Sequence, residues 1–198
     1  AAAIYAGART IGFSSHAPLP FPCAWCMRAE SFPSYDGDMD ELKHNSHIQV
    51  YKGLEVDYVS GVIGPADFKK HLDYTIGSVH FVEAFRDGRY WEIDNAHNIF
   101  VNGLNEIFNG DIKAAISRYY EITREMLLNS TPEIVGHLDK IKIHNPDGKY
   151  FNESDGWYRN EVEKTLQTIQ QTGVIVEVNT RGLYQKKSST TYPSPWIL

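Results

Sequence analysis

Three side chains able to bind a metal ion are spread along the chain, and each follows a short apolar segment. They are Glu55, His80 and His137. Imidazole and carboxylate groups are good ligands for zinc, iron and manganese. A divalent cation lowers the pKa of bound water to about 7, and a carboxylate can bridge two cations. Although a single histidine at a strand end is more often a structural residue, the three together favour a metal-dependent hydrolytic site.

Other polar side chains stand at corresponding places. His16 follows the first apolar segment, and Asn179 and Arg181 follow the last one. Each apolar segment therefore ends in a group able to bind metal or phosphate. In parallel α/β folds the carboxyl ends of the strands converge on one mouth, where active sites lie. We therefore expect residues far apart in the sequence to meet there.

The elements that would position these residues alternate along the chain. Short, largely apolar segments predict buried parallel strands, and apolar residues at three- to four-residue spacing predict helices. The expected strands are 10–13, 48–54, 74–79, 134–135 and 174–178, and the expected helices are 65–71, 111–128 and 157–171. The segment 31–46 has little periodicity and is interpreted either as one continuous loop or as the site of a deletion, and the polar segment 185–191 is expected to be a loop. This alternation indicates a parallel α/β sheet or barrel.

The composition of the 198 residues is that of a globular protein, with 42% hydrophobic and 22% charged residues. A net charge of −6 disfavours nucleic acid as a partner and is compatible with a small phosphorylated substrate. No apolar run approaches the ~20 residues that cross a membrane. With only Cys23 and Cys26, a reducing cytoplasm is the default expectation, and the pair is expected to have a packing role in a loop.

Three further polar residues near His137 allow more than one interpretation. Asp139 is expected to orient His137 or to bind metal itself, because carboxylates commonly fix a ligand imidazole. Lys140 and Lys142 could assist in phosphate binding, but a solvated face is the favoured interpretation.

The order of the motifs resembles one known family. The chain carries, in sequence, Gly-Phe-Ser-Ser-His16, Gly-Leu-Glu55-Val-Asp-Tyr, Tyr-Thr-Ile-Gly-Ser-Val-His80, Gly-His137-Leu-Asp and Val-Asn179-Thr-Arg-Gly. This order resembles the polymerase-and-histidinol-phosphatase (PHP) superfamily, and within it the monofunctional histidinol-phosphatases. The segment 27–35 resembles the lid-like loop of those enzymes.

The resemblance implies a fold and a set of roles. The fold would be a distorted (β/α)7 barrel, similar to a TIM barrel, with three divalent transition metals, zinc, manganese or iron. Glu55 would bridge two metals, His80 and His137 would bind one of those two, and His16 would bind the third. His16 is also a candidate proton donor to the leaving group. Arg181 is a candidate catalytic residue that neutralises the phosphate.

The resemblance also implies a substrate. Arg28, Arg181 and Asn179 are candidates for binding it, because guanidinium groups match phosphate oxygens. The expected reaction is hydrolysis of L-histidinol phosphate to L-histidinol and phosphate, a step of histidine biosynthesis. One alternative is a PHP phosphoesterase that acts on nucleotides or nucleic-acid ends. Another is a non-catalytic barrel that serves as a scaffold.

The ends of the chain suggest missing strands. The first eight residues are typical of a helix that stops at Gly7, and the last five are typical of a helix that begins at Pro195. Two motifs of the family, an early His-x-His and a late Asp-x-His, are absent. We therefore expect residues 1–198 to form a single barrel domain that lacks its first and last strand units.

Overall fold

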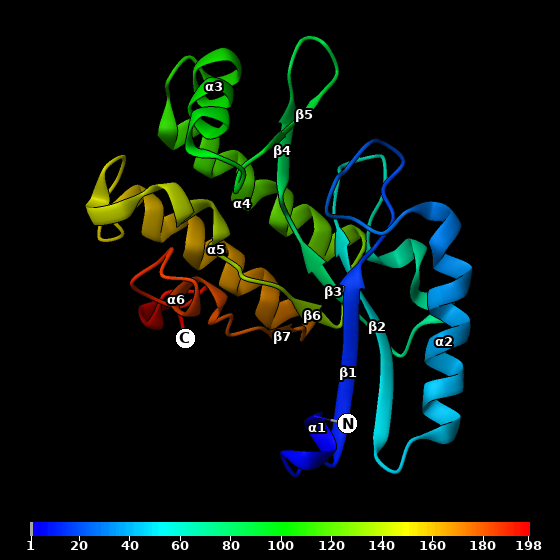
Figure 1. Ribbon diagram of the computed structural model, residues 1–198. Helices are drawn as coiled ribbons and strands as arrows, with labels where there is room; N and C mark the ends of the chain where they lie inside the picture. Colours follow the sequence, from blue (N-terminus) through cyan, green and yellow to red (C-terminus); the bar gives the residue numbers. More distant parts are fainter. Residues whose placement is uncertain (1) are drawn as a thin grey trace.

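A parallel sheet forms the centre of the molecule (Figure 1). A computed structural model describes residues 2–198. Its five-stranded sheet has the order β1-β2-β3-β6-β7, and every neighbouring pair is parallel. The strands are β1 (Thr10–His16), β2 (Gln49–Asp57), β3 (Tyr74–Ser78), β6 (Ile134–Val135) and β7 (Ile175–Val176). All five strands predicted from the sequence are therefore confirmed, as is the α/β class.

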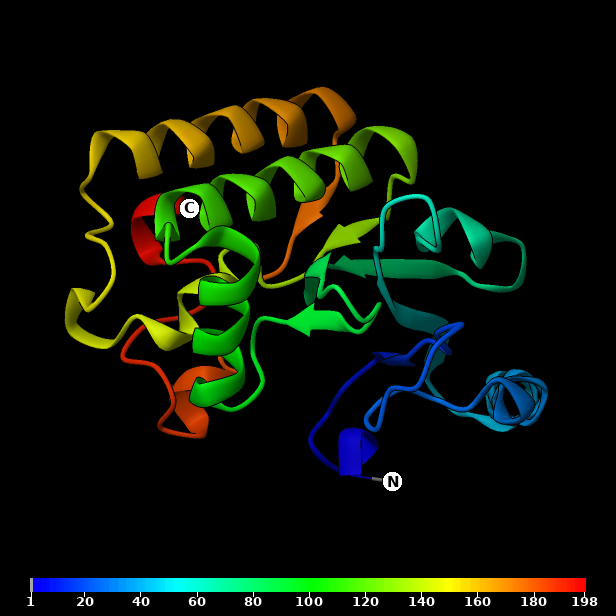
Figure 2. The ribbon, with the colours of Figure 1, turned by 90° about the horizontal axis from the view of Figure 1, so that it is seen from above.

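Helices flank this sheet, and α4 and α5 run side by side along one side of it (Figure 2). The predicted helices at 111–128 and 157–171 are confirmed. The Asp111 carboxylate caps α4 by accepting a hydrogen bond from the backbone N–H of Ala114 at 3.0 Å. Gly173 ends α5 with a φ of 71°. The helices are α1 (Ala2–Tyr5), α2 (Phe32–Asn45), α3 (His97–Phe108), α4 (Ile112–Asn129), α5 (Gly156–Thr172) and α6 (Arg181–Tyr184).

The expected loop at 31–46 was wrong, because most of it forms α2. Met39 is the one buried residue of this helix. Apolar residues recur along α2 at three- and four-residue spacing: Phe32, Tyr35, Met39 and Leu42. Phe32 and Tyr35 pack against a small buried cluster on the sheet. The helix also offers Asp36 and Asp40 to the Lys52 ammonium on β2, with both N···O distances 2.7 Å. The apolar spacing was overlooked because Pro33 and Gly37 interrupt the segment with residues of low helix propensity.

Other segments differ from expectation in detail. The segment 65–71 forms two short 3₁₀ turns, Pro65–Asp67 and Lys69–His71, instead of one helix. The polar segment 185–191 lies outside regular structure, as expected. At the last residues, a 3₁₀ turn begins at Pro195 after Ser194. Every helix among residues 2–198 is too short or too polar to cross a lipid bilayer.

A hairpin and a helix were missed by the sequence analysis. β4 (Phe81–Ala84) and β5 (Tyr90–Glu92) pair antiparallel, and α3 packs against β5. The fully buried Trp91 indole lies against Gly103 of α3 so closely that a Cβ there would come within 2.1 Å of the ring. The glycine thus allows the contact that anchors the hairpin, although it weakens the helix signal in the sequence.

Candidate metal centre

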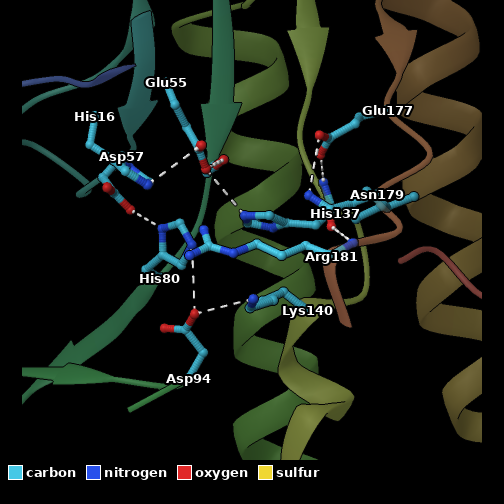
Figure 3. Close-up of polar contacts among 12 residues, drawn as sticks. His16, Glu55, Asp57, His80, Asp94, His137, Lys140, Glu177, Asn179 and Arg181 are labelled. Carbon is cyan, nitrogen blue, oxygen red and sulfur yellow. Dashed lines mark hydrogen bonds and ion pairs between the residues drawn. The ribbon is translucent and has the colours of Figure 1, made fainter. Parts of the chain in front are cut away.

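The carboxyl ends of the strands bring the candidate ligands to one rim of the sheet (Figure 3). His16 on β1 is the direct register partner of Glu55 on β2. His80 lies two residues beyond β3, and His137 lies two residues beyond β6. Because all these strands are parallel, their ends point the same way, and the four side chains meet as the strand-end argument requires.

Glu55 lies at the centre of this group. Its Oε1 is 3.2 Å from Nε2 of His137, and its Oε2 is 3.6 Å from Nε2 of His16. The Ser78 hydroxyl donates a hydrogen bond to Oε1 at 2.8 Å. Burial favours the neutral acid, but the hydrogen bond and charge of His137 outweigh it and hold the pKa of Glu55 well below its usual range. The side chain is therefore a carboxylate with both oxygens directed at imidazoles.

Asp57 fixes the orientation of His80. Nδ1 of the fully buried imidazole lies 2.6 Å from Oδ1 of Asp57. Burial lowers the pKa of His80, but the charge and hydrogen bond of Asp57 outweigh this effect and raise it to about 9. A carboxylate in this position keeps a proton on Nδ1 and leaves Nε2 as the atom available to a cation.

The donor set fits a divalent transition metal. Glu55, His80 and His137 each offer one ligand atom, and these atoms all lie within 4.8 Å of one another. Nδ1 of His16 and Nδ1 of His137 are buried without a hydrogen-bond partner in the described part of the chain. Burial lowers the pKa of His16 despite the attraction of Glu55, which favours the neutral, metal-binding form of the imidazole. One carboxylate and neighbouring imidazoles match the preferences of zinc, iron and manganese.

Arg181 lines the same cavity from the end of β7. Its side chain extends toward the imidazoles (Figure 3). Its backbone N–H donates to Oδ1 of Asn179 at 3.0 Å, and the Asn179 amide donates to Glu177 at 3.2 Å. Glu177 in turn accepts the backbone N–H of His137 at 2.9 Å. A continuous series of polar contacts thus links the Arg181 backbone to the metal-binding rim.

Arg28 is not brought to this cavity. It is exposed and lines a separate depression together with Cys23 and Cys26. The two cysteines lie in a loop, as expected, but they are joined by a disulfide, which the sequence analysis did not predict. Between them, Trp25 reaches the metal-binding rim, and its ring centroid is 4.6 Å from that of His16.

The segment after β6 differs from expectation. Asp139 does not contact His137 through a hydrogen bond. It is fully buried, pairs with the Lys142 ammonium at 2.8 Å and accepts the backbone N–H of Ser194 at 2.9 Å. The expected solvated face at Lys140 and Lys142 was wrong: Lys142 is buried, and Lys140 lines the cavity. Asp139 thus ties the end of the chain to the sheet.

The rim opens into a cavity of about 350 Å³. Several of its walls were not foreseen from the sequence. The indole N–H of Trp25 donates to Glu92 at 2.9 Å, and Asp94 lies 3.3 Å from the Lys140 ammonium. Glu92 is the last residue of β5 and Asp94 follows it, so both belong to the hairpin region that was missed and no predicted strand end pointed to them. The lining also includes Lys187 and Tyr192.

A parallel α/β sheet with imidazole and carboxylate groups at its carboxyl rim is an arrangement found in metal-dependent hydrolases. Residues 1–181 match the model of the PHP domain, and the chain belongs to this family.

Similar proteins carry consistent names. The chain is 27% identical to a probable histidinol-phosphatase of Deinococcus radiodurans, over 98% of this chain and 70% of that protein. It is 26% identical to the histidinol-phosphatase of Bacillus subtilis, over 99% of this chain and 78% of that protein. A solved structure of a putative histidinol phosphatase from Listeria monocytogenes has a TM-score of 0.80 at 21% identity. The alignment covers 98% of this chain and 79% of that one. The same fold therefore occurs in that protein.

A second solved structure carries bound molecules. The histidinol phosphate phosphatase of Lactococcus lactis, complexed with zinc, L-histidinol and phosphate, has a TM-score of 0.62 at 21% identity. The alignment covers 93% of this chain and 66% of that one.

Proposed function

We propose that this chain carries out metal-dependent hydrolysis of a phosphate monoester, with L-histidinol phosphate as substrate and L-histidinol and phosphate as products. The observation that carries the proposal is the cluster of Glu55, His80 and His137 at the rim of a cavity in a PHP-family chain. The names of the relatives, and the zinc, L-histidinol and phosphate in the Lactococcus complex, support this substrate.

The arrangement of the four side chains suggests which of them would share a cation. Glu55, His80 and His137 would hold one cation, and the second oxygen of Glu55 would reach another. His16, on the other side of Glu55, would hold a third cation. When bound, divalent zinc, manganese or iron supplies Lewis acidity, which activates water and neutralises negative charge on a phosphoryl group.

The chain's own residues supply binding and orientation. Arg181, directed into the cavity, would bind phosphate oxygens and stabilise the charge that the phosphoryl group develops. Asn179 would orient Arg181 by accepting its backbone N–H. His16 would donate a proton to the leaving oxygen only in a site where it does not hold the third cation, because one imidazole does not serve both roles at once. Because Arg28 lies outside the cavity, a contact between Arg28 and the substrate would require the loop to move.

Replacing Glu55 tests the metal site and the reaction together. With the full-length protein supplied with manganese or zinc, Glu55→Gln is expected to lower bound metal and phosphate release from L-histidinol phosphate, by about 100-fold or more in rate. Elemental analysis and a phosphate assay measure the two effects. Glu163→Gln, the same change on an exposed face of α5, is the matched control and should change neither. Full metal content and activity in Glu55→Gln would contradict the assignment.

A further inference from the structure

One acidic wall of the cavity has no part in the proposed metal site. Asp94 follows β5 and lies among the cavity-lining residues (Figure 3). Its Oδ2 is 3.3 Å from the Lys140 ammonium and 3.9 Å from Nε2 of His80. Its Oδ1 is buried and has no hydrogen-bond partner within residues 2–198. A half-satisfied carboxylate in a binding cavity is costly unless a ligand completes its contacts.

Cationic and anionic side chains line different sides of the cavity. Arg181 and Lys187 supply positive charge, which suits a phosphate. Glu92 and Asp94 supply negative charge on the side of the hairpin, and the single cation Lys140 beside Asp94 offsets it only in part, so a phosphate would be disfavoured there. Such a division fits a substrate that carries an anionic group and a cationic group close together.

The two acidic residues differ in what they already bind. Glu92 is engaged at both oxygens: Oε1 accepts the indole N–H of Trp25 at 2.9 Å, and Oε2 accepts the amide of Asn95 at 2.8 Å. Glu92 therefore positions Trp25 as an apolar wall. Asp94 has no comparable pair of hydrogen bonds. Of the two carboxylates, it is therefore the one that is available to bind a ligand.

We propose that Asp94 is a specificity-determining residue that binds the ammonium group of the substrate. This inference rests on the proposed function. In L-histidinol phosphate two carbons separate the amine from the ester oxygen, so the two groups lie close together. Asp94 is likewise close to the metal-binding rim, since its Oδ2 is 3.9 Å from Nε2 of His80. The ammonium is charged near neutral pH, whereas an imidazole of ordinary pKa is largely neutral there. Lys140 partly neutralises the carboxylate at Oδ2, and the substrate ammonium would bind at Oδ1, which has no partner within residues 2–198.

A pair of substrates that differ only in the amine tests this role. The full-length, metal-loaded protein is assayed with L-histidinol phosphate and with 3-(imidazol-4-yl)propyl phosphate, the same ester without its amino group. Asp94→Asn is expected to lower kcat/KM for L-histidinol phosphate by about 10- to 100-fold, the range of one charge-assisted hydrogen bond, mainly through KM. For the ester without the amine, the change should stay below about threefold. Calorimetry with the product L-histidinol should show a matching loss of affinity.

Asp87→Asn is the matched control, since Asp87 lies in the exposed turn of the same hairpin and pairs with Arg89. It should leave both substrates unchanged. An equal fall for both esters in Asp94→Asn would overturn the proposal, because it would mean that Asp94 acts through Lys140. Loss of bound metal in Asp94→Asn would also overturn it and would make Asp94 a ligand. If the wild-type protein hydrolysed neither ester, the proposed function itself would fail and this inference with it.

Discussion

The candidate metal centre lies between two regions that are held together in different ways. His16 and Glu55 come from β1 and β2, where the buried apolar cluster consists of Ala17, Leu54 and Val56. His80 and His137 lie beside a much larger cluster that includes buried aromatic residues of α3, α4 and α5. In Figure 2, α4 and α5 lie together on one side of the sheet, and α2 lies apart from them next to β1 and β2.

In the first region, hydrogen bonds and ion pairs contribute much of the contact between elements, whereas apolar packing provides most of it in the second. Lys52 links α2 to β2, and the Tyr35 hydroxyl donates to the carbonyl of Gly53 at 2.7 Å. The Tyr74 ring lies flat over Gly53, where a Cβ would come within 2.4 Å of it. The comparison indicates that Glu55 is held by a small apolar cluster together with a few polar contacts, whereas His137 is supported by a much larger core.

The largest effect should come from cutting into the large core. Trp91→Ala removes a fully buried indole that lies 5.5 Å from Phe100 and 5.7 Å from Phe108, centroid to centroid. We expect the free energy of unfolding to fall by about 3–5 kcal/mol in urea titrations. Tyr51→Ala, on the exposed side of β2, is the control and should cost under about 1 kcal/mol. Equal losses in the two variants would remove the distinction between the regions.

A smaller effect is expected at Lys52. Lys52→Met keeps the length of the side chain but leaves Asp36 and Asp40 without their cation, so we expect a loss of about 1–3 kcal/mol. Because fewer residues of α2 than of α4 are buried, the amides of α2 should also exchange with solvent faster than those of α4, as hydrogen exchange would show.

The matched control for Lys52 lies in the other region. Lys164 pairs with Glu161 at 2.9 Å but is about half exposed, and Lys164→Met should cost under about 0.5 kcal/mol. A cost at Lys52 no larger than at Lys164 would show that α2 does not depend on its polar contacts.

The same contrast explains what the sequence could predict. The strands were found because each is a short apolar run, although the expected burial is wrong for the edge strands β1 and β7, which contain no buried residue. Glu55, His80 and His137 were found because polar groups follow those runs. α2 was missed although Phe32, Tyr35, Met39 and Leu42 have helical spacing, because Pro33 and Gly37 weaken the helix signal of the segment. The hairpin was missed because its first strand follows His80 almost directly, without a turn signal to separate it from β3.

The walls of the cavity needed the three-dimensional structure for a different reason. Asp94 and Trp25 stand at the end of a hairpin and in a loop, and neither position has a pattern that points to the metal site. Asp57 did have a signal, since it shares a strand end with Glu55 two residues away. Its contact with His80 depends on how two strands lie beside each other, which spacing along one strand does not give.

The smallest effect on stability is expected at the ion pair between α4 and α5, next to the large core. Glu161 on α5 accepts hydrogen bonds from Arg124 on α4 at 3.0 Å and from Lys164 at 2.9 Å. Burial raises the pKa of Glu161, but these cations outweigh it and lower the pKa below its usual value. The pair therefore stabilises the fold above the unfolded pKa of about 4.3, and this contribution is lost as the pH falls through the lower folded value.

Glu161→Gln should cost about 0.5–1 kcal/mol at pH 7, because the pair is partly exposed and α4 and α5 already share an apolar interface. The difference in unfolding free energy between wild type and variant should shrink as the pH is lowered below about 4.3 and vanish once the folded carboxylate is protonated as well. Urea titrations at several pH values measure it. A difference that stayed constant over this range would mean that the charge of Glu161 contributes nothing. A loss as large as that at Lys52 would mean that polar contacts matter equally in both regions.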